Sequence, residues 1–389
     1  MTTFIADAKN IHEEIIKDRR HLHQNAEAGM DLPNTVAYVE KRLNEIGLVP
    51  QKCGQSGIKA VLTGKKAGKT ILLRGDMDAL PMAEENDLPF RTTTQAAHNC
   101  GHDFHTSMLL GAAKLLKQKE DELEGSVVFM FQPGEEVFQG ARSMVDNGLM
   151  SNPDVDAAFA LHVLPDGVPG NIYFGAGNTL SSCDGFEITI KGKGCHGAMP
   201  HLGYDPIYVG VQIYQAFQHL IARESIPRET VTLTFGQFSA GAVNNIIPET
   251  AVLKGTLRTY NPQLRENLRQ RMQEIITHLG QAFKVETTYT VLSDVAPTFN
   301  NPELLDTMLH YIDEMDYDFI KNPDFSLSAS DDFSIVAGMV PTVYMFLGSK
   351  VEDCPYPLHN PGVRLNEDAL PLGAAIHAQC AYNWLKNNK

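Results

Sequence analysis

Basic residues are scarce in this chain of 389 residues, which carries 32 Lys and Arg against 47 Asp and Glu and a formal net charge of −15. Nucleic acids and anionic membrane surfaces are bound through basic patches, so we expect neither as a partner. Apolar runs long enough to span a bilayer are also missing. The first residues, MTTFIADAKNIHEEIIKDRRHLHQ, are charged and lack the apolar core of a signal peptide, which favours a cytoplasmic protein.

Cysteine is scarce as well, with six residues scattered at positions 53, 100, 183, 195, 354 and 380. Small secreted domains held by disulfides have a much higher cysteine density. We therefore expect free thiols or metal ligands rather than disulfides. Low-complexity tracts and internal repeats are absent, and the length predicts two domains.

The order of the predicted elements changes along the chain. Up to residue 183, short apolar strands such as KTILLRG, SVVFMFQ and DAAFALHV alternate with helices predicted at 4–28, 33–47 and 105–119. This alternation predicts an α/β domain, with a mostly parallel sheet covered by helices on both faces.

From residue 184 the predicted order is strand, helix, strand, strand, helix, strand, with the helices at 206–223 and 262–283. This βαββαβ order is the ferredoxin-like α+β arrangement. After residue 294 the α/β pattern resumes, with the strand PTVYMFLG and a last helix at about 366–386. We therefore predict an α/β domain in two segments, 1–183 and 295–389, interrupted by an inserted domain at 184–294.

Acidic residues and a histidine follow or end three of the predicted strands. Asp76 and Asp78 come directly after KTILLRG, and Glu135 and Glu136 follow SVVFMFQ behind a Pro-Gly turn. His162 ends a third strand, in DAAFALHV. Because ligands bind beyond the carboxyl ends of the strands in an open α/β sheet, we expect these groups to converge.

The stretch AAHNCGHDFHTS, residues 96–107, places three histidines and Cys100 within eight positions. Alone, Cys100 could be a nucleophile, half of a disulfide, a metal ligand or a buried thiol. Together with the groups at the strand ends, its thiolate and the imidazoles favour a site for a divalent metal such as zinc. One of two adjacent glutamates can then bind the metal while the other accepts a proton from water.

These motifs resemble those of a known family. GDMDALPM, HNCGHDFHTSMLLGAA, FQPGEE, KGKGCHGAMPH, NNIIPE and LHNPGV occur in the order seen in the metal-dependent aminoacylase and carboxypeptidase superfamily. They look most like its amidohydrolase branch, which includes hippurate hydrolases, N-acyl-amino-acid amidohydrolases, auxin-conjugate hydrolases and N-acetyldiaminopimelate deacetylases. The resemblance implies a catalytic α/β domain and an inserted domain that carries the contact of a homodimer.

The resemblance also implies two divalent metal ions held by five ligands, which are Cys100, Glu136, His359, His102 and His162. Cys100 would bridge both ions. Glu136 and His359 would complete one site, and His102 and His162 would complete the other. Glu135 would be the general base, which takes a proton from water and returns it to the departing amine. Zinc suits a bridging thiolate, relatives often use manganese, and nickel or cobalt would fit the same donors.

Residues of the inserted domain are matched by the same resemblance. His196 in GCHGAMPH is similar to a histidine that reaches across the dimer to help hold the oxyanion. Asn245 and Arg258 are similar to the pair that binds the free α-carboxylate of the substrate, which the fork of an arginine suits.

Many relatives have a histidine ligand two residues before an aspartate. In this chain the aspartate is Asp78, and the position two residues before it holds Asp76 instead of a histidine. The resemblance gives Asp78 the task of orienting a ligand imidazole. Asp76 and His98 receive no role, and His105 is expected to support the site rather than bind metal.

The predicted function is the removal of an acyl group from an N-acyl amino acid by a dinuclear metal-dependent amidohydrolase. A dipeptidase or carboxypeptidase of the same superfamily is the nearest alternative. A Cys100 nucleophile with a histidine base would leave FQPGEE without a role. A non-enzymatic binding protein would be expected to lack a ligand or the base. The acyl group, the amino acid and the native metal stay open.

Overall fold

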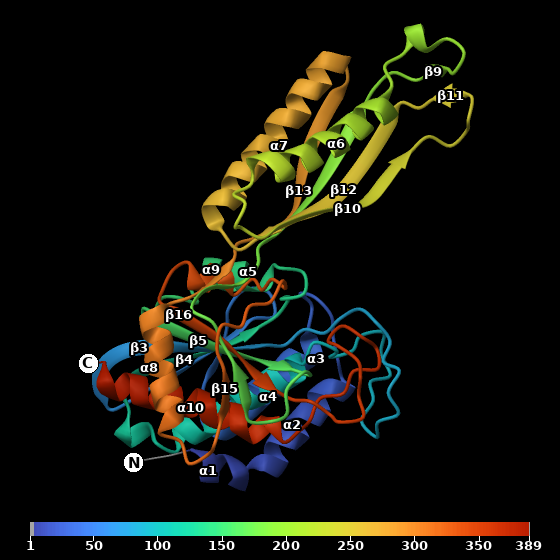
Figure 1. Cartoon of the computed structure of the whole chain (residues 1–389). Helices are drawn as coiled ribbons and strands as arrows, with labels where there is room; N and C mark the ends of the chain where they lie inside the picture. Colours follow the sequence, from blue (N-terminus) through green and yellow to red (C-terminus); the bar gives the residue numbers. More distant parts are fainter. Residues whose placement is uncertain (1–3, 389) are drawn as a thin grey trace. The chain divides into compact units, whose positions relative to one another are not determined.

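The computed structural model describes residues 4–388, and the chain divides into two compact units (Figure 1). Unit 1 comprises the described chain up to Thr179, the segment Phe299–Ser326 and the chain from Asp331 onward. Unit 2 comprises Leu180–Thr298 and Leu327–Ser330. The domain boundaries expected at 183/184 and 294/295 stay a prediction, and residues 1–3 and 389 lie outside the described part.

Unit 1 contains an eight-stranded sheet of order β1-β2-β4-β3-β5-β16-β6-β15. Its central strands β4, β3, β5 and β16 are parallel, and antiparallel pairs occur toward both edges. This confirms the predicted α/β class. The strands are β1 (Pro50–Lys52), β2 (Ile58–Thr63), β3 (Lys66–Asp76), β4 (Glu124–Gln132), β5 (Ala157–Leu164), β6 (Asn171–Tyr173), β15 (Ile320–Asn322) and β16 (Thr342–Gly348).

Helices cover both faces of this sheet, with α4 and α10 on one face and α5 and α9 on the other (Figure 1). The helices of unit 1 are α1 (Ile5–Asn10), α2 (His12–Gln24), α3 (Pro33–Ile46), α4 (His102–Lys117), α5 (Gly140–Asp146), α8 (Pro302–Asp313), α9 (Ser334–Ala337) and α10 (Ala369–Asn387). Pro33 begins α3, and Gly47 ends it in the left-handed conformation, as helix punctuation predicts.

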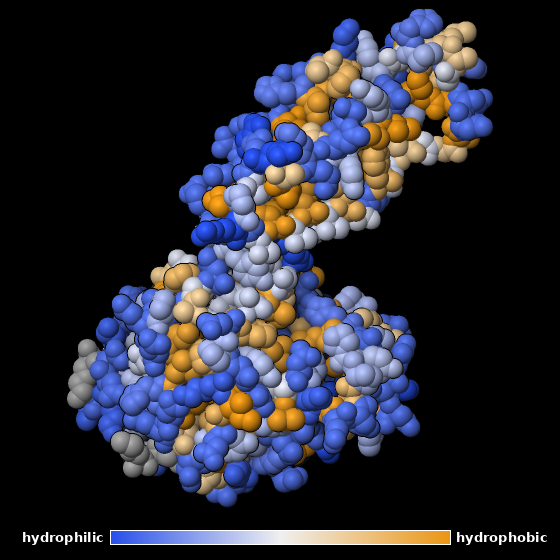
Figure 2. Space-filling view, in the orientation of Figure 1, coloured by the Kyte–Doolittle hydropathy of each residue, from blue (hydrophilic) through white to orange (hydrophobic). Residues whose placement is uncertain are grey.

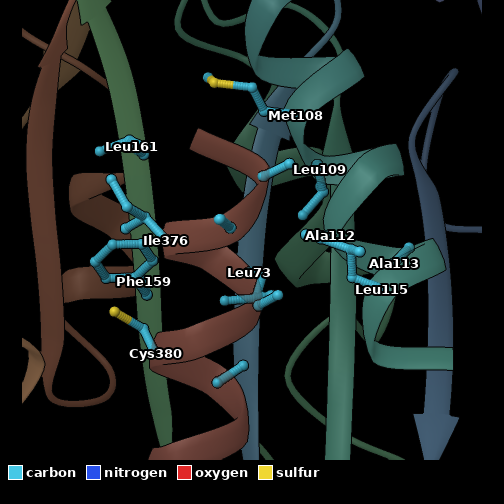
Figure 3. Packing of buried hydrophobic residues seen from close by; sticks show 14 of the residues in the cluster. Leu73, Met108, Leu109, Ala112, Ala113, Leu115, Phe159, Leu161, Ile376 and Cys380 are labelled. Carbon is cyan, nitrogen blue, oxygen red and sulfur yellow. The ribbon is translucent and has the colours of Figure 1, made fainter. Parts of the chain in front are cut away.

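The core of unit 1 lies where α4 and α10 pack against β3 and β5 (Figure 3). Both helices are buried nearly all round and, apart from the polar first two turns of α4, are mostly apolar, as expected for helices enclosed within a core. A Cβ atom at Gly111 of α4 would lie 2.9 Å from Ile15 and 3.0 Å from Ala374 of α10. Glycine therefore permits the close approach that holds α4, and the residues at its start, in a fixed place.

Two helices predicted in this part of the sequence differ from those observed. The helix expected at 4–28 is two helices, α1 and α2, interrupted at Ile11 and ending at Gln24. The helix expected from His105 begins at His102, so His102 lies on a helix and not in a loop. Gly101 precedes it with φ 89°, and no side chain caps the helix, so the usual sequence signal for a helix start is missing.

Unit 2 contains a four-stranded antiparallel sheet of order β10-β12-β8-β13 with α6 and α7 on one face (Figure 1). This confirms the predicted βαββαβ arrangement. Asp205 and Asn261 cap the two helices by accepting hydrogen bonds from backbone N–H groups of the first turn. The elements are β8 (Cys183–Lys191), α6 (Pro206–Glu224), β10 (Val231–Ala240), β12 (Thr250–Thr259), α7 (Pro262–Phe283) and β13 (Glu286–Val295).

Two pairs of short strands complete the fold. β9 (Cys195–His196) pairs with β11 (Ile246–Ile247) in unit 2, and β7 (Gly177–Leu180) pairs with β14 (Thr298–Asn300). Among residues 4–388, none of the helices has the length and apolar character needed to cross a membrane.

Candidate metal centre

Candidate residues of unit 1 lie at the ends of four parallel strands or in the segments that follow them, at the carboxyl edge of the sheet. β3 is parallel to β4 and β5, and β5 is parallel to β16, so all four strands end at the same edge. Asp76 ends β3, Glu135 and Glu136 follow β4 after a Pro-Gly turn, and His162 lies near the end of β5. The segment after β16 carries His359. The convergence expected from the strand ends is therefore observed.

The ligand atoms of Cys100, His102 and His162 lie within 4.8 Å of one another, and all three residues are buried. His162 donates from Nδ1 to the carbonyl oxygen of Val163 at 2.7 Å, which leaves Nε2 facing the Cys100 sulfur at 3.6 Å. That hydrogen bond fixes the ring and leaves the nitrogen nearest the thiol available as a ligand.

A second group, Cys100, Glu136 and His359, also lies within 4.8 Å. His359 Nε2 is 3.2 Å from the Cys100 sulfur and 3.4 Å from Glu136 Oε1, and its side chain is 53% exposed. The His359 backbone has φ 65°, a conformation that non-glycine residues rarely adopt, and its N–H donates to the carbonyl of Asn99. Backbone strain of this kind is concentrated at functional sites.

The two groups share Cys100, in the division that the family resemblance implies. Both ring nitrogens of His102 and Glu136 Oε1 are buried, and within residues 4–388 their nearest charged partners lie no closer than 3.4 Å. Buried polar atoms that lack close hydrogen bonds are costly, so these atoms fit a site completed by cations. Thiolate, imidazole and carboxylate are donors for zinc and similar divalent metals. Metal binding by these five residues stays a prediction.

Positive charge is favoured among Cys100, Glu136 and His359. Hydrogen bonds to the Cys100 and Glu136 side chains raise the pKa of His359 to about 10. Burial raises the pKa of the Cys100 thiol, and the charge of Glu136 raises it further. The surroundings that stabilise the protonated imidazole would also favour a divalent cation, which binds the neutral imidazole and takes the place of its proton.

Asp78 connects a proposed ligand to the turn that carries both glutamates. Its Oδ1 lies 3.4 Å from His102 Nδ1 and accepts a hydrogen bond from the Glu135 N–H at 3.0 Å. Its Oδ2 accepts from the Glu136 N–H at 3.2 Å. The contact with the imidazole is the one expected from the sequence, and the two backbone contacts add a second task.

Glu135 is 6% exposed, and its Oε2 lies 3.8 Å from His102 Nε2. Its carboxylate and those of Asp331 and Asp332 lie within 4.8 Å of one another. Burial raises the pKa of Glu135 well above its usual value, and the charges of Asp331 and Glu136 raise it further. A carboxylate with raised proton affinity suits the role of accepting a proton and later returning it.

The structure assigns contacts to residues that the sequence left without a role. His105 donates from Nδ1 to Asp76 Oδ1 at 2.6 Å and accepts at Nε2 from the Val163 N–H at 2.9 Å. Both nitrogens are used, so His105 supports the site. His98 is buried with neither nitrogen hydrogen-bonded in the described residues, and burial lowers its pKa to about 3.

Sequence reasoning missed Asp331 and Asp332, which follow no predicted strand and sit in the polar stretch SLSASDDF. Two adjacent carboxylates in such a stretch usually indicate a solvated loop, and no local pattern marks these as buried. The carboxylate of Asp103, the residue after His102, pairs with Arg19 and His23, each at 2.8 Å.

The residues expected to contact substrate from the inserted domain lie in unit 2. His196 is exposed on β9 and accepts at Nδ1 from the Ala198 N–H, and it faces Ile246 across the β9–β11 pair. Asn245 directly precedes β11, is exposed, and accepts at its carbonyl from the Gly197 N–H. Arg258 is half-buried on β12 and donates to Ser330 Oγ at 3.0 Å. The hairpin brings the first two together, and the roles of all three stay predictions.

Comparison with known proteins identifies relatives along nearly the whole chain. Residues 72–383 match the model of peptidase family M20/M25/M40. An N-acetyl-L-cysteine deacetylase of Bacillus subtilis is 32% identical over 97% of this chain and 90% of its own length. Thermostable carboxypeptidase 2 of Saccharolobus solfataricus is 33% identical over 96% of each chain. The crystal structure of a dinuclear metal-binding M20 peptidase of Bacillus subtilis has a TM-score of 0.83 and 27% identity, covering 97% of this chain and 99% of that one.

Proposed function

The chain belongs to peptidase family M20/M25/M40, and from that premise we propose that it is a dinuclear metal-dependent hydrolase that removes an acyl group from an N-acyl amino acid. The observation that carries this proposal is the pair of ligand groups sharing Cys100, with the buried carboxylate of Glu135 beside them. A deacetylase and a dinuclear metal-binding peptidase among the relatives support it.

Cys100, Glu136 and His359 would hold one divalent cation, and Cys100, His102 and His162 the other. Bound there, the two cations would polarise the amide carbonyl and make water a better nucleophile at neutral pH. Zinc, manganese, nickel or cobalt would fit these donors.

Glu135 supplies the proton transfers. Its Oε2 is close to the ligand cluster, so it can accept a proton from the attacking water. Burial among carboxylates favours the protonated form, which can then donate to the amine nitrogen as the amide bond breaks. Asp78 holds the backbone of both glutamates, so the base and its neighbouring ligand keep a fixed spacing.

Arg258 and Asn245 would recognise the free α-carboxylate of the amino acid, and His196 would help to hold the oxyanion. An arginine forms two parallel hydrogen bonds with a carboxylate, and an amide can add a third. This assignment implies that substrates without a carboxylate bind poorly.

A dipeptidase or carboxypeptidase activity is the second candidate, because two relatives at 33% identity are named carboxypeptidases. The Cys100 nucleophile is less favoured. Its thiol is buried, burial raises its pKa, and its sulfur faces both candidate metal groups.

The substrate class is tested by a panel. The protein is stripped with a chelator, reconstituted with Zn²⁺ or Mn²⁺, and assayed on N-acetyl amino acids, hippurate, N-acetyldiaminopimelate and simple dipeptides. We expect metal-dependent release of the amino acid, with N-acyl amino acids ahead of dipeptides. Activity that survives exhaustive chelation would contradict a metal mechanism, and a preference for dipeptides would favour the second candidate.

We also propose a homodimer formed through unit 2. β10 is an edge strand of its sheet, and exposed apolar side chains lie along it and along α6 (Figure 2). They include Ile207, Tyr208, Val211, Tyr214 and Phe238. An exposed apolar surface beside an open strand edge favours association with a second copy. Sedimentation of the wild type as a dimer and of Tyr214→Asp/Phe238→Asp as a monomer would support this contact, whereas a monomeric wild type would exclude it.

A further inference from the structure

Arg74 of β3 is 1% exposed and takes no part in the chemistry described above. Its guanidinium contacts three buried side chains from different segments of unit 1. Nη1 lies 2.8 Å from Asp76 Oδ2, Nη2 donates to Asp331 Oδ1 at 3.0 Å, and Nε donates to Gln132 Oε1 at 2.9 Å. The three contacts use all three nitrogens of the planar fork, which a lysine could not reproduce.

The oxygen of Asp76 that Arg74 engages is the one that faces the candidate metal ligands. Asp76 Oδ2 lies 3.4 Å from His102 Nε2, while Oδ1 accepts from His105. Carboxylate oxygens bind divalent cations readily, so an unpaired Asp76 would compete for the coordination of a metal at His102. Pairing with a guanidinium removes that oxygen from competition.

Arg74 also fixes a carboxylate beside the proposed base Glu135, that of Asp331. Asp331 accepts from Arg74 at Oδ1 and from the Tyr344 hydroxyl at Oδ2, at 2.8 Å, so both of its oxygens are held. The Asp331 carboxylate lies within 4.8 Å of that of Glu135. The negative charge of Asp331 would otherwise disfavour a negative charge on Glu135. Asp331 therefore needs a fixed position and a compensating positive charge if Glu135 is to ionise and act as the base.

We propose that Arg74 is a positioning residue that holds Asp76 out of the metal coordination and Asp331 beside Glu135, so that one buried guanidinium sets both the ligand geometry and the place of the base. This inference rests on the function proposed above. It also explains why this chain can have Asp76 at the position where many relatives have a histidine ligand. The Asp76 carboxylate is paired with Arg74 and His105, so it is not free to bind metal.

The test uses full-length wild type, Arg74→Met, Arg74→Lys and the double variant Arg74→Met/Asp76→Asn. Arg271→Met is the matched control, because Arg271 is a half-buried arginine of unit 2, paired with Glu224 and Glu274 and outside the candidate site. For each protein, Mn²⁺ binding to the metal-free form is measured by calorimetry and stability by thermal unfolding. The kcat and KM are measured on the best substrate of the panel.

We expect Arg74→Met to bind Mn²⁺ at least as tightly as the wild type, because Asp76 is freed to join the coordination. Its kcat should fall about 10- to 100-fold with little change in KM, as for other residues that orient ligands. Removing the freed carboxylate in the double variant should return the Mn²⁺ affinity to the wild-type value and recover part of the kcat. Arg74→Lys should lie between the wild type and Arg74→Met.

Loss of Mn²⁺ affinity in Arg74→Met together with a lowered unfolding temperature, with no recovery in the double variant, would make Arg74 a structural residue only and overturn the proposal. A wild-type kcat in Arg74→Met would also overturn it. If Arg74→Met does not fold, Arg74→Lys decides by the same comparison of kcat with KM. The Mn²⁺ measurements need no substrate, so they judge this inference even if the proposed reaction is wrong.

Discussion

In unit 1 the candidate residues are mostly buried and are held by contacts from several segments, whereas those of unit 2 are exposed or half-buried. Asp78 alone contacts His102 and the backbone of both glutamates. In unit 2, His196 accepts a hydrogen bond from a residue two positions away, and the Asn245 side chain lies in the exposed β9–β11 hairpin.

The difference follows from where the residues lie in each fold. Parallel strands deliver the unit 1 residues to one edge of a sheet covered on both faces, where supporting side chains surround them. The unit 2 residues lie on an antiparallel sheet with helices on one face only and on a small hairpin. Unit 1 therefore holds its candidate residues in place by contacts within the chain, and under the proposed function we expect the unit 2 residues to gain further partners from substrate or a second copy. Changes in unit 1 should therefore affect metal and kcat, and changes in unit 2 should affect KM.

The largest effect is expected from Cys100→Ala, because Cys100 belongs to both ligand groups. Activity should become undetectable. In the wild type, Mn²⁺ at 100 times its Kd should stabilise the fold by about 2.7 kcal/mol, and the variant should lose most of this. Thermal unfolding with and without Mn²⁺ measures the difference. Cys195→Ala, a change of a half-buried thiol in unit 2, should keep the full metal effect; an equal loss there would show that the metal binds elsewhere.

The next effect is expected from Glu135→Gln, which should lower kcat by about 10²- to 10⁴-fold, the range for loss of a general base. The two metal ions should remain bound, since Glu135 is assigned no ligand role. Its neighbour Glu136 is the matched comparison, because Glu136→Gln should lose metal together with activity. Elemental analysis of both variants beside their kcat separates the two roles, and metal loss in Glu135→Gln would make it a ligand.

The strand-end residues could be predicted because parallel strands place their carboxyl ends at one edge, a rule that needs no contact information. The rule placed Asp76, Glu135 and His162 together, as observed. The predicted start of α4 lies three residues after the observed one, because Gly101 adopts a left-handed conformation and no capping side chain marks the boundary. A Cβ atom at Gly101 would lie 2.4 Å from the side chain of Val163 in β5. The need for glycine at this position therefore comes from a tertiary contact, which the neighbouring sequence does not reveal.

The supporting residues could not be predicted from the sequence, for a related reason. Arg74 and Asp331 are separated by 257 positions and meet only because β3 and the segment before α9 are packed together. The neighbouring sequence does not distinguish either residue from a charged residue at the surface. The ion pair that compensates the cost of burying the two charges forms only in the tertiary structure. Family motifs predict the ligands, and the packing shows which residues hold the predicted ligands in place.

A smaller effect is expected from Asp78→Asn, because asparagine has one acceptor oxygen for the N–H groups of Glu135 and Glu136. Residues that orient metal ligands contribute about 10- to 100-fold to activity or metal affinity. We expect a loss in this range in kcat, with the fold retained. Steady-state kinetics beside circular dichroism measures it, and Asp154→Asn, an exposed change in the same unit, should have no effect. Wild-type kinetics in Asp78→Asn would mean that the Glu135–Glu136 turn holds its position unaided.

The smallest effect is expected in unit 2, from Arg258→Gln. A hydrogen bond to a charged group contributes about 1.5–3 kcal/mol, and because Arg258 is half-buried we expect the lower end, or about a tenfold rise in KM. The kcat and metal content should change little, and Arg271→Gln should change neither.

The matched substrate makes the test specific: an N-acyl amino acid amide lacks the carboxylate, so wild type and Arg258→Gln should cleave it equally. If the variant loses as much on the amide as on the acid, Arg258 does not read the carboxylate. If it loses kcat instead of KM, the contrast between an organised unit 1 and a substrate-dependent unit 2 is wrong, because a residue of unit 2 would then belong to the catalytic machinery itself.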